Sequence, residues 1–215
     1  MTFSSVVNTA TTTATSGTSL ALNMPASIVA GRLLLAFVGA SNDITATGAI
    51  SAWTPVVSQA GTSGSVKIFG KVAAGGDTAT LTGLSSATSR PCVVVAQINN
   101  WSGVLASLGS ATAASTADPP SLTMSTSDDY MWIAAIRAGT GTGVTVPTSY
   151  GGLVSASGAG GVGCVSIATR ALTATTENPG AFGGSLSAPL IAATLAVPPV
   201  LAPANTGAAF LPFFA

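Results

Sequence analysis

Hydrophobic positions along this chain recur with a period of two, which is the period of β-strands rather than of helices. The pattern is clearest in short runs at 32–40 (RLLLAFVGA), 65–72 (SVKIFGKV), 78–84 (TATLTGL) and 92–98 (CVVVAQI). These runs are rich in β-branched and aliphatic residues and are bounded by Gly, Pro, Asn or Ser. No segment combines a sustained helical stripe with capping residues. The pattern therefore predicts an all-β fold.

The strand pattern occurs twice along the chain. The run GRLLLAFVGA, which begins at Gly31, corresponds to DYMWIAAIRA, which begins 98 positions later at position 129. The run WTPVVS from Trp53 corresponds to YGGLVS from Tyr150, and PCVVV from Pro91 corresponds to PLIAA from Pro189. The sequence therefore predicts two halves built on one plan.

Charged residues follow the same repeat. The run VKIFGKV corresponds to VSIATRA, which places Lys71 opposite Arg170. An acid follows each of them, Asp77 in the first half and Glu177 in the second. We interpret these acids as turn hydrogen-bond acceptors or as surface ion-pair partners of the two basic residues, in preference to a catalytic role.

One domain over residues 1–197 is the expected organisation, with pseudo-repeats at about 18–106 and 118–197. We expect the halves to interleave into one antiparallel, two-sheet β-sandwich of jelly-roll type. Two separate sandwiches remain the alternative. The join at 107–120 (SLGSATAASTADPP) is interpreted as a stiff crossover strap because it ends in two prolines.

Composition excludes several classes of function. Charged residues make up 6% of the 215 residues, against about 25% in an ordinary soluble domain. The net charge is zero, so the chain lacks the excess of basic residues expected of a protein that binds nucleic acid or an anionic membrane. Histidine is absent, so histidine-based nucleophile activation and histidine metal sites are excluded. We expect no catalytic residue, metal site or cofactor.

Two motifs with possible chemistry have simpler interpretations. Gly158, Gly160 and Gly163 form a GxGxxG pattern, but a strand and not a helix follows it, so we expect a hairpin. Asp128 and Asp129 are adjacent, and adjacent residues of a strand face opposite ways, so they cannot flank one bond. We expect them to end a turn before the run YMWIAAI. The loop acids Asp43 and Asp118 suit turn capping, although spacing alone does not exclude a calcium site.

Aromatic residues offer one candidate binding platform. Trp53, Trp132, Tyr130 and Tyr150 are predicted to be core residues, because aromatic side chains dominate buried area. Trp101 follows two asparagines at a strand end, so it is the best candidate for exposure and for contact with a glycan.

The cysteines and the two termini complete the picture. Cys92 and Cys164 lie in apolar runs and are predicted to be buried free thiols rather than a disulfide. The first residues lack the basic start and apolar run of a signal peptide, so none is expected. The apolar stretch from Pro189 to the C-terminus contains too many prolines for a membrane helix.

The tail at 198–215 is apolar, rich in proline and free of charge. We expect it to be buried against the body or against another chain, because such a segment is a solubility hazard in water. Its partner-binding candidates are Phe210, Leu211, Phe213 and Phe214.

Several runs together resemble a known group of proteins. In order they are GRLLLAFVGA, AWTPVV, VKIFGKVAAGGD, INNWSGV, ADPPSLT and ATRALTATTENPGAF. They resemble β-sandwich minor structural proteins of tailed bacteriophages, of the kind that decorate heads or form tail and fibre parts. The resemblance runs from about Thr18 to Val197 and does not include the apolar tail.

The resemblance implies a non-enzymatic virion protein that assembles as a homotrimer and contacts other virion proteins, and it carries no catalytic residue. A carbohydrate-binding module that recognises a host-surface glycan is the alternative. A glycoside hydrolase or lyase of sandwich fold is the weakest hypothesis, because no two acids have the spacing of a catalytic pair.

Overall fold

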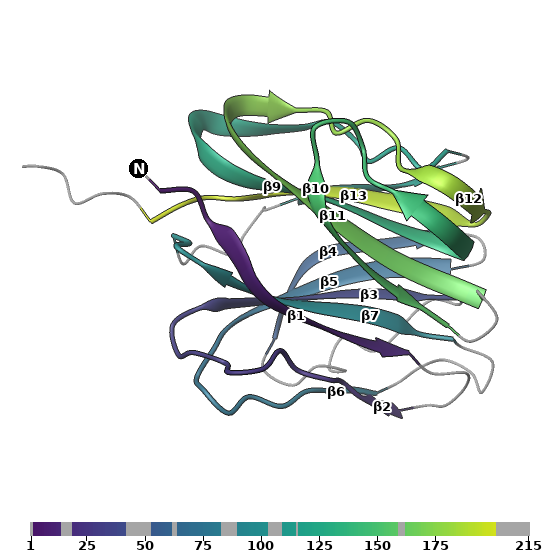
Figure 1. The fold of residues 1–215 in the computed structure, drawn as a ribbon, viewed down its shortest axis with the longest axis horizontal. Coiled ribbons are helices and arrows are strands. Elements are labelled where there is room, and N and C mark those ends of the chain that lie inside the picture. The colour runs from purple at the N-terminus through teal and green to yellow at the C-terminus, as the bar shows by residue number, and fades with distance from the viewer. Residues whose placement is uncertain are drawn as a thin grey trace, which may run out of the picture.

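The computed structural model describes residues 2–13, 19–41, 53–61, 64–82, 90–102, 109–114, 116–158 and 162–200. Regular structure in these ranges consists of β-strands, and two antiparallel sheets pack face to face (Figure 1). The predicted all-β, two-sheet antiparallel sandwich is confirmed. The described part of the chain contains no helix long enough and apolar enough to cross a membrane.

Each sheet is built from one half of the chain. The N-sheet has the strand order β1 (Ser5–Thr13), β7 (Cys92–Asn99), β3 (Leu33–Ala40), β5 (Gly64–Val72), β4 (Thr54–Gly61). The C-sheet has the order β8 (Gly109–Ala114), β13 (Leu190–Val197), β9 (Leu122–Thr145), β11 (Val162–Glu177), β10 (Gly151–Ser157). Two smaller pairings involve β12 (Gly183–Ser187) with β9, and β2 (Ser19–Ala21) with β6 (Thr80–Thr82).

The two main sheets have one topology. In both, the main strands of a half lie in the order first, fifth, second, fourth, third. The predicted repeat is therefore confirmed, but the expected interleaving of the halves is wrong, because no main strand of one half pairs within the sheet of the other. Each sheet satisfies its backbone hydrogen bonds within its own half, and the sheets pack through side chains. Backbone hydrogen bonds between the halves occur at one end, where Asn100 and Ser102 bond to Val200 and Pro198.

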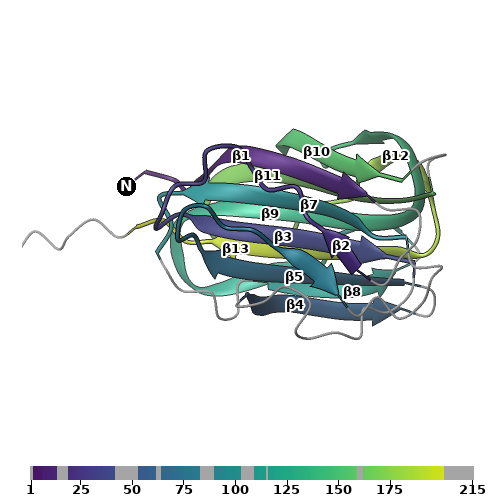
Figure 2. The same cartoon turned by 90° about the horizontal axis from the view of Figure 1, so that it is seen from below.

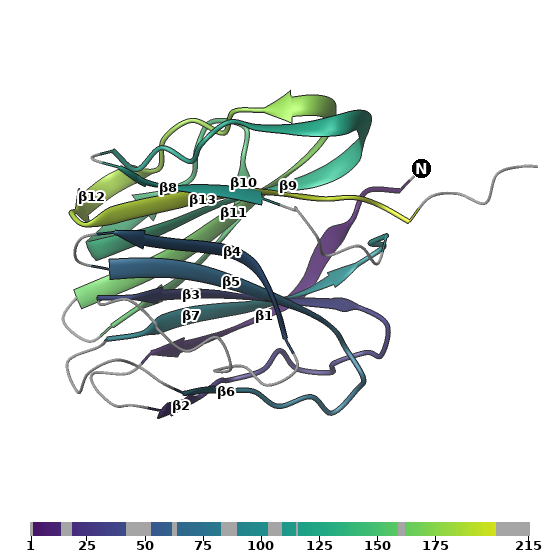
Figure 3. The ribbon, with the colours of Figure 1, turned by 180° about the vertical axis from the view of Figure 1, so that it is seen from behind.

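The packing of the sheets follows an approximate twofold relationship. β1 lies beside β10, and its equivalent β8 lies beside β4, the equivalent of β10 (Figures 1 and 3). The same exchange relates the contact of β7 with β11 to that of β13 with β5. β3 contacts its own equivalent β9, so the pseudo-twofold axis passes between these two strands.

Strand register confirms most of the residue equivalences. Lys71 pairs with Leu34 in the N-sheet, and Arg170 pairs with Trp132 in the C-sheet. Since Leu34 and Trp132 are 98 positions apart, Lys71 and Arg170 occupy equivalent places, as predicted.

The last strand of each half requires a correction of one residue. Cys92 pairs with Gly39, whereas Arg137, the equivalent of Gly39, pairs with Ile191. Cys92 therefore corresponds to Ile191 and not to Leu190. A shift of one residue reverses which face a strand side chain occupies, and both Cys92 and Ile191 face the space between the sheets.

The join between the halves is also different from the expected strap. Residues 109–114 form β8, which pairs with β13 at the edge of the C-sheet and is the equivalent of β1. The run GSATAA has little intrinsic strand signal, so its pairing with β13, rather than its own hydrophobicity, makes it a strand. The structural repeats therefore begin at β1 and at β8, before the predicted starts at about 18 and 118.

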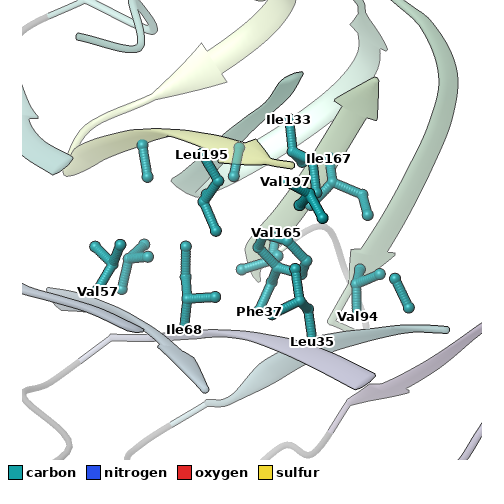
Figure 4. Packing of buried hydrophobic residues seen from close by; sticks show 14 of the residues in the cluster. Leu35, Phe37, Val57, Ile68, Val94, Ile133, Val165, Ile167, Leu195 and Val197 are labelled. Carbon is teal, nitrogen blue, oxygen red and sulfur yellow. The ribbon is translucent and has the colours of Figure 1, made fainter. Parts of the chain in front are cut away.

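The central core lies between the two sheets (Figure 4). Leu35, Phe37 and Ile68 from the N-sheet face Ile133 and Val165 from the C-sheet, and all five side chains are almost fully buried. Burial of an aliphatic or aromatic side chain stabilises a fold by about 1.5–3 kcal/mol, so this layer supplies much of the stability.

Each sheet also has an apolar outer face with its own cover. Over the N-sheet, Leu22 and Ala79, next to the β2–β6 pair, pack on Leu34 and Val95. Over the C-sheet, the loop residues Ala117 and Phe182 pack in one cluster with Trp132, Ala134 and Ile136 of β9. Because β3 and β13 are buried on both faces, their sequences are almost entirely apolar rather than alternating; Thr194 in β13 is the exception, and its hydroxyl donates to Pro120 O.

Candidate functional site

The two predicted ion pairs are present at equivalent places. Lys71 Nζ lies 2.5 Å from Asp77 Oδ1, and Arg170 Nη1 lies 2.9 Å from Glu177 Oε1. The hydrogen bond from Lys71 holds the pKa of Asp77 below its ordinary value; burial opposes this effect, and the Ala74 backbone N–H supports it. Each acid is nearly covered while its basic partner is partly exposed, so these pairs fasten segments next to the strands.

Asp128 and Asp129 do not end a turn, which corrects the sequence prediction. They lie inside β9, which begins earlier, at Leu122, and pairs there with the far end of β11. Thr173 Oγ1 donates to Asp129 Oδ1 across the pair. The described ranges contain no group of three or more His, Cys, Asp or Glu residues that could hold a metal. Asp118 is exposed in a loop, and Asp43 lies outside the described residues.

The glycine pattern lies at a hairpin, as predicted. Gly158 N–H donates to Gly163 O at 3.0 Å, between β10 and β11. Gly163 has a φ of 72°, which favours glycine. Gly160 lies outside the described residues.

The aromatic residues are core residues, including the one predicted to be exposed. Trp53, Tyr130, Trp132 and Tyr150 are buried, as expected. Trp101 is also buried, with 7% of its surface exposed, and its Nε1 donates to Gly31 O at 3.0 Å. Asn100 has a φ of 54° and turns the chain, so Trp101 points back toward the core rather than out. The glycan platform predicted at Trp101 therefore has no exposed ring face.

Both cysteines are free and buried, as predicted. Burial raises the pKa of Cys92 to about 11, and burial also raises the pKa of Cys164. Neither thiol is therefore a ready nucleophile at neutral pH.

The edges of the sandwich carry the most unusual chemistry. The four strands at the sheet edges, β1, β4, β8 and β10, contain no charged residue. Natural edge strands usually carry lysines, prolines or bulges that prevent pairing with another chain. Here β4 has a proline and a bulge, β1 has a bulge at Val7 and β10 has a register shift between Gly151 and Val154, but none of the four edge strands carries a charged side chain.

A groove of about 550 Å³ runs along one of these edges. The strands that flank it, β1 and β10, lie side by side (Figure 2). Residues 4–9 of β1 and its approach line one wall, and β10 and β11 of the C-sheet line the other. Val7, the bulged residue, is 37% exposed in it, and Val154 and Ile167 form part of the far wall. The sequence shows that these runs carry no charge, but it does not show that they lie at sheet edges, because edge position depends on strand pairing. This site was therefore not predicted from the sequence.

The C-terminal tail begins beside this groove. Ser4 Oγ donates to Asn100 O at 2.8 Å and to Pro198 O at 3.1 Å, and Val200 N–H donates to Asn100 O at 3.0 Å. The last described residues are thus fastened to the start of β1. The predicted partner-binding residues, Phe210, Leu211, Phe213 and Phe214, lie outside the described residues.

Comparison of the chain with models of known protein families, with curated proteins and with solved structures finds no match.

Proposed function

We propose that this chain is a non-enzymatic structural protein of a tailed-bacteriophage virion, which works by assembly with copies of itself and with other virion proteins. It would decorate the head or form part of the tail or a fibre. The family resemblance of the sequence supports the virion context, and the edges of the sandwich support the mode of action.

The observation that carries the proposal is the uncharged character of all four edge strands. An edge strand presents unpaired backbone N–H and C=O groups, and without charged side chains it can pair with another chain at low cost. The central regions of stable protein interfaces are likewise depleted of charge. A protein selected to remain a free monomer would be expected to protect such edges.

The basic residues of the two ion pairs are placed away from these edges. Lys71 and Arg170 lie on the inner strands β5 and β11, where they pair with Asp77 and Glu177. With a net charge of zero, little electrostatic repulsion opposes association of copies. We propose a closed homotrimer, the state that the family resemblance implies.

The alternative, a glycan-binding module, is not favoured. Its motivation was an exposed Trp101, and this side chain packs in the core and donates its N–H to Gly31. A sugar-stacking site needs an accessible ring face.

Light scattering on purified protein tests the proposal through matched lysine variants. Leu153→Lys places a charge on the β10 edge, and Val72→Lys places one at a somewhat more exposed position on the inner strand β5. We expect the parent and Val72→Lys to form one multimer and Leu153→Lys to dissociate at least tenfold more readily, with thermal stability unchanged. A parent protein that stays monomeric at every concentration would refute assembly.

A further inference from the structure

We infer that the groove between β1 and β10–β11 receives the C-terminal segment, residues 201–215, of a second copy of this chain. The inference rests on the proposed function, since it specifies how copies assemble. Four observations carry it: an asymmetry of the sandwich, the bulge in β1, the chemistry of the tail and the place where the tail leaves the body.

The groove has a more exposed apolar wall than its pseudo-symmetric counterpart. On the opposite side of the sandwich, β4 packs beside β8, and Val57 of β4 is 7% exposed within the central core (Figure 3). Val154 of β10 is its equivalent, because Val57 pairs with Ile68 and Val154 pairs with the matching Ile167. Val154 is only partly buried and lines the groove. The apolar wall at Val154 is therefore less covered than the equivalent place at Val57.

The bulge in β1 places an exposed apolar residue in the lining of the groove. Val6 pairs with Ile98 and Asn8 pairs with Gln97, which leaves Val7 as the extra residue. Bulges re-aim side chains and often accompany functional sites. Val7 is exposed and lines the groove, and next to it β1 has a backbone edge that no other described strand occupies.

The tail has the chemistry that this groove would take. Residues 201–215 (LAPANTGAAFLPFFA) contain no charge and end in a run of three phenylalanines and a leucine around Pro212. An extended segment can hydrogen-bond to a free strand edge while alternate side chains enter the groove. Pro212 lacks an N–H, which an added strand tolerates on the side that faces solvent.

The reach and direction of the tail favour a neighbour's groove over its own. Fifteen residues span about 50 Å when extended, and six residues of groove wall span about 20 Å, so the segment can cross a gap and fill the groove. β13 runs toward the end of the sandwich where β1 begins, while β1 runs back from that end (Figure 1). The last described residues, up to Val200, are fastened there through Asn100. Filling its own groove would require a complete reversal, whereas a second copy requires none. Such head-to-tail contacts form a closed ring when the rotation that relates neighbouring copies brings the last copy back to the first.

Cross-linking between two separately tagged copies tests the inference. One copy carries Val7→Cys and the other Phe213→Cys. A control copy carries Val72→Cys, at a position that is more exposed than Val7 but outside the groove. The natural thiols stay in place because both are buried. After mixing and mild oxidation, we expect a disulfide between the Val7→Cys and Phe213→Cys copies at least tenfold more abundant than with the Val72→Cys copy.

The mass of a chain that ends at Val200 separates this inference from the proposed function. We expect the truncated chain to fall from the multimer to a single chain with its thermal stability retained. A truncated chain that keeps the multimer would overturn the tail as the assembly device while leaving assembly intact. A Val7→Cys, Phe213→Cys double variant that cross-links only within one chain would show that the tail fills its own groove and would also overturn the inference. A full-length monomer would refute both proposals.

Discussion

Gly39 leaves the space that the side chain of Arg137 occupies. The two residues hold equivalent positions in β3 and β9 and lie against each other at the pseudo-twofold axis: a Cβ at position 39 would be 2.7 Å from Arg137 Cγ. A strictly symmetric sandwich would place two identical side chains here. The chain instead combines the smallest residue in one half with one of the largest in the other, so the repeats are no longer interchangeable.

Gly39→Ala is expected to destabilise the fold by about 1–3 kcal/mol, because the added methyl group overlaps Arg137 and Val165 in a packed core. Urea unfolding measures the change. Gly151→Ala in β10 is the matched control, since a Cβ there meets nothing within 4 Å and a strand alanine costs less entropy than glycine. Equal stability of both variants would contradict the account of this contact.

Arg137 is a buried cation with one protein hydrogen bond. Its Nη1 donates to Pro189 O at 3.0 Å, its Nε has no partner, and burial lowers its pKa. We expect Arg137→Met to leave the free energy of unfolding unchanged or to raise it, since a buried charge without a carboxylate partner is costly. Arg137→Ala is expected to cost about 2–4 kcal/mol through the cavity it leaves. Equal losses in both variants would mean that the guanidinium group itself stabilises the fold.

The Asp77–Lys71 pair predicts a pH dependence of stability. The folded-state pKa of Asp77 is lowered, so its contribution is fully present above its unfolded pKa of about 4 and is lost as the pH falls through the folded pKa. Asp77→Asn is therefore expected to cost up to about 1 kcal/mol at pH 7 and progressively less below pH 4. Denaturant titrations at pH 7 and at pH 3 measure both values. Asp118→Asn, in an exposed loop, is the control, and a cost for Asp77→Asn that is the same at both pH values would contradict the prediction.

The two thiols are predicted to be unreactive toward thiol reagents in the native protein. Because burial raises the pKa of Cys92 to about 11 and also raises the pKa of Cys164, a thiol reagent at pH 8 should modify neither at a rate above that of unfolding. In strong denaturant, both should react at once. Rapid labelling of the native chain would show that one of the thiols is accessible.

The sequence revealed the plan of each half but not how the halves meet. The sequence alone identified Lys71 as the equivalent of Arg170, and Trp53 as the equivalent of Tyr150, because equivalent strands keep equivalent residue types. The sequence led to a wrong prediction of interleaved halves, because alternation identifies strands and says nothing about their partners. β8 shows this most clearly: GSATAA lacks a strand pattern and becomes an edge strand only through β13.

The candidate site was less predictable than the fold. Trp101 was expected to be exposed because it follows two asparagines at a strand end, but the left-handed conformation of Asn100 turns it inward. Such a backbone turn leaves no periodic trace in a sequence. The groove beside β1 likewise exists only because distant strands, β1 and β10, meet across the two sheets.

Hydrogen exchange of the edge-strand amides in the assembled protein tests most directly the claim that these edges mediate assembly. Amides of β1 that do not bond to β7, together with those of the β10 edge, should exchange slowly in the multimer and quickly after dilution to a single chain. Inner strands such as β3 should be protected in both states and serve as the internal reference. The account predicts protection at the edges that depends on concentration. Rapid exchange of every edge amide within a stable multimer would contradict it and would place the interface elsewhere on the sandwich.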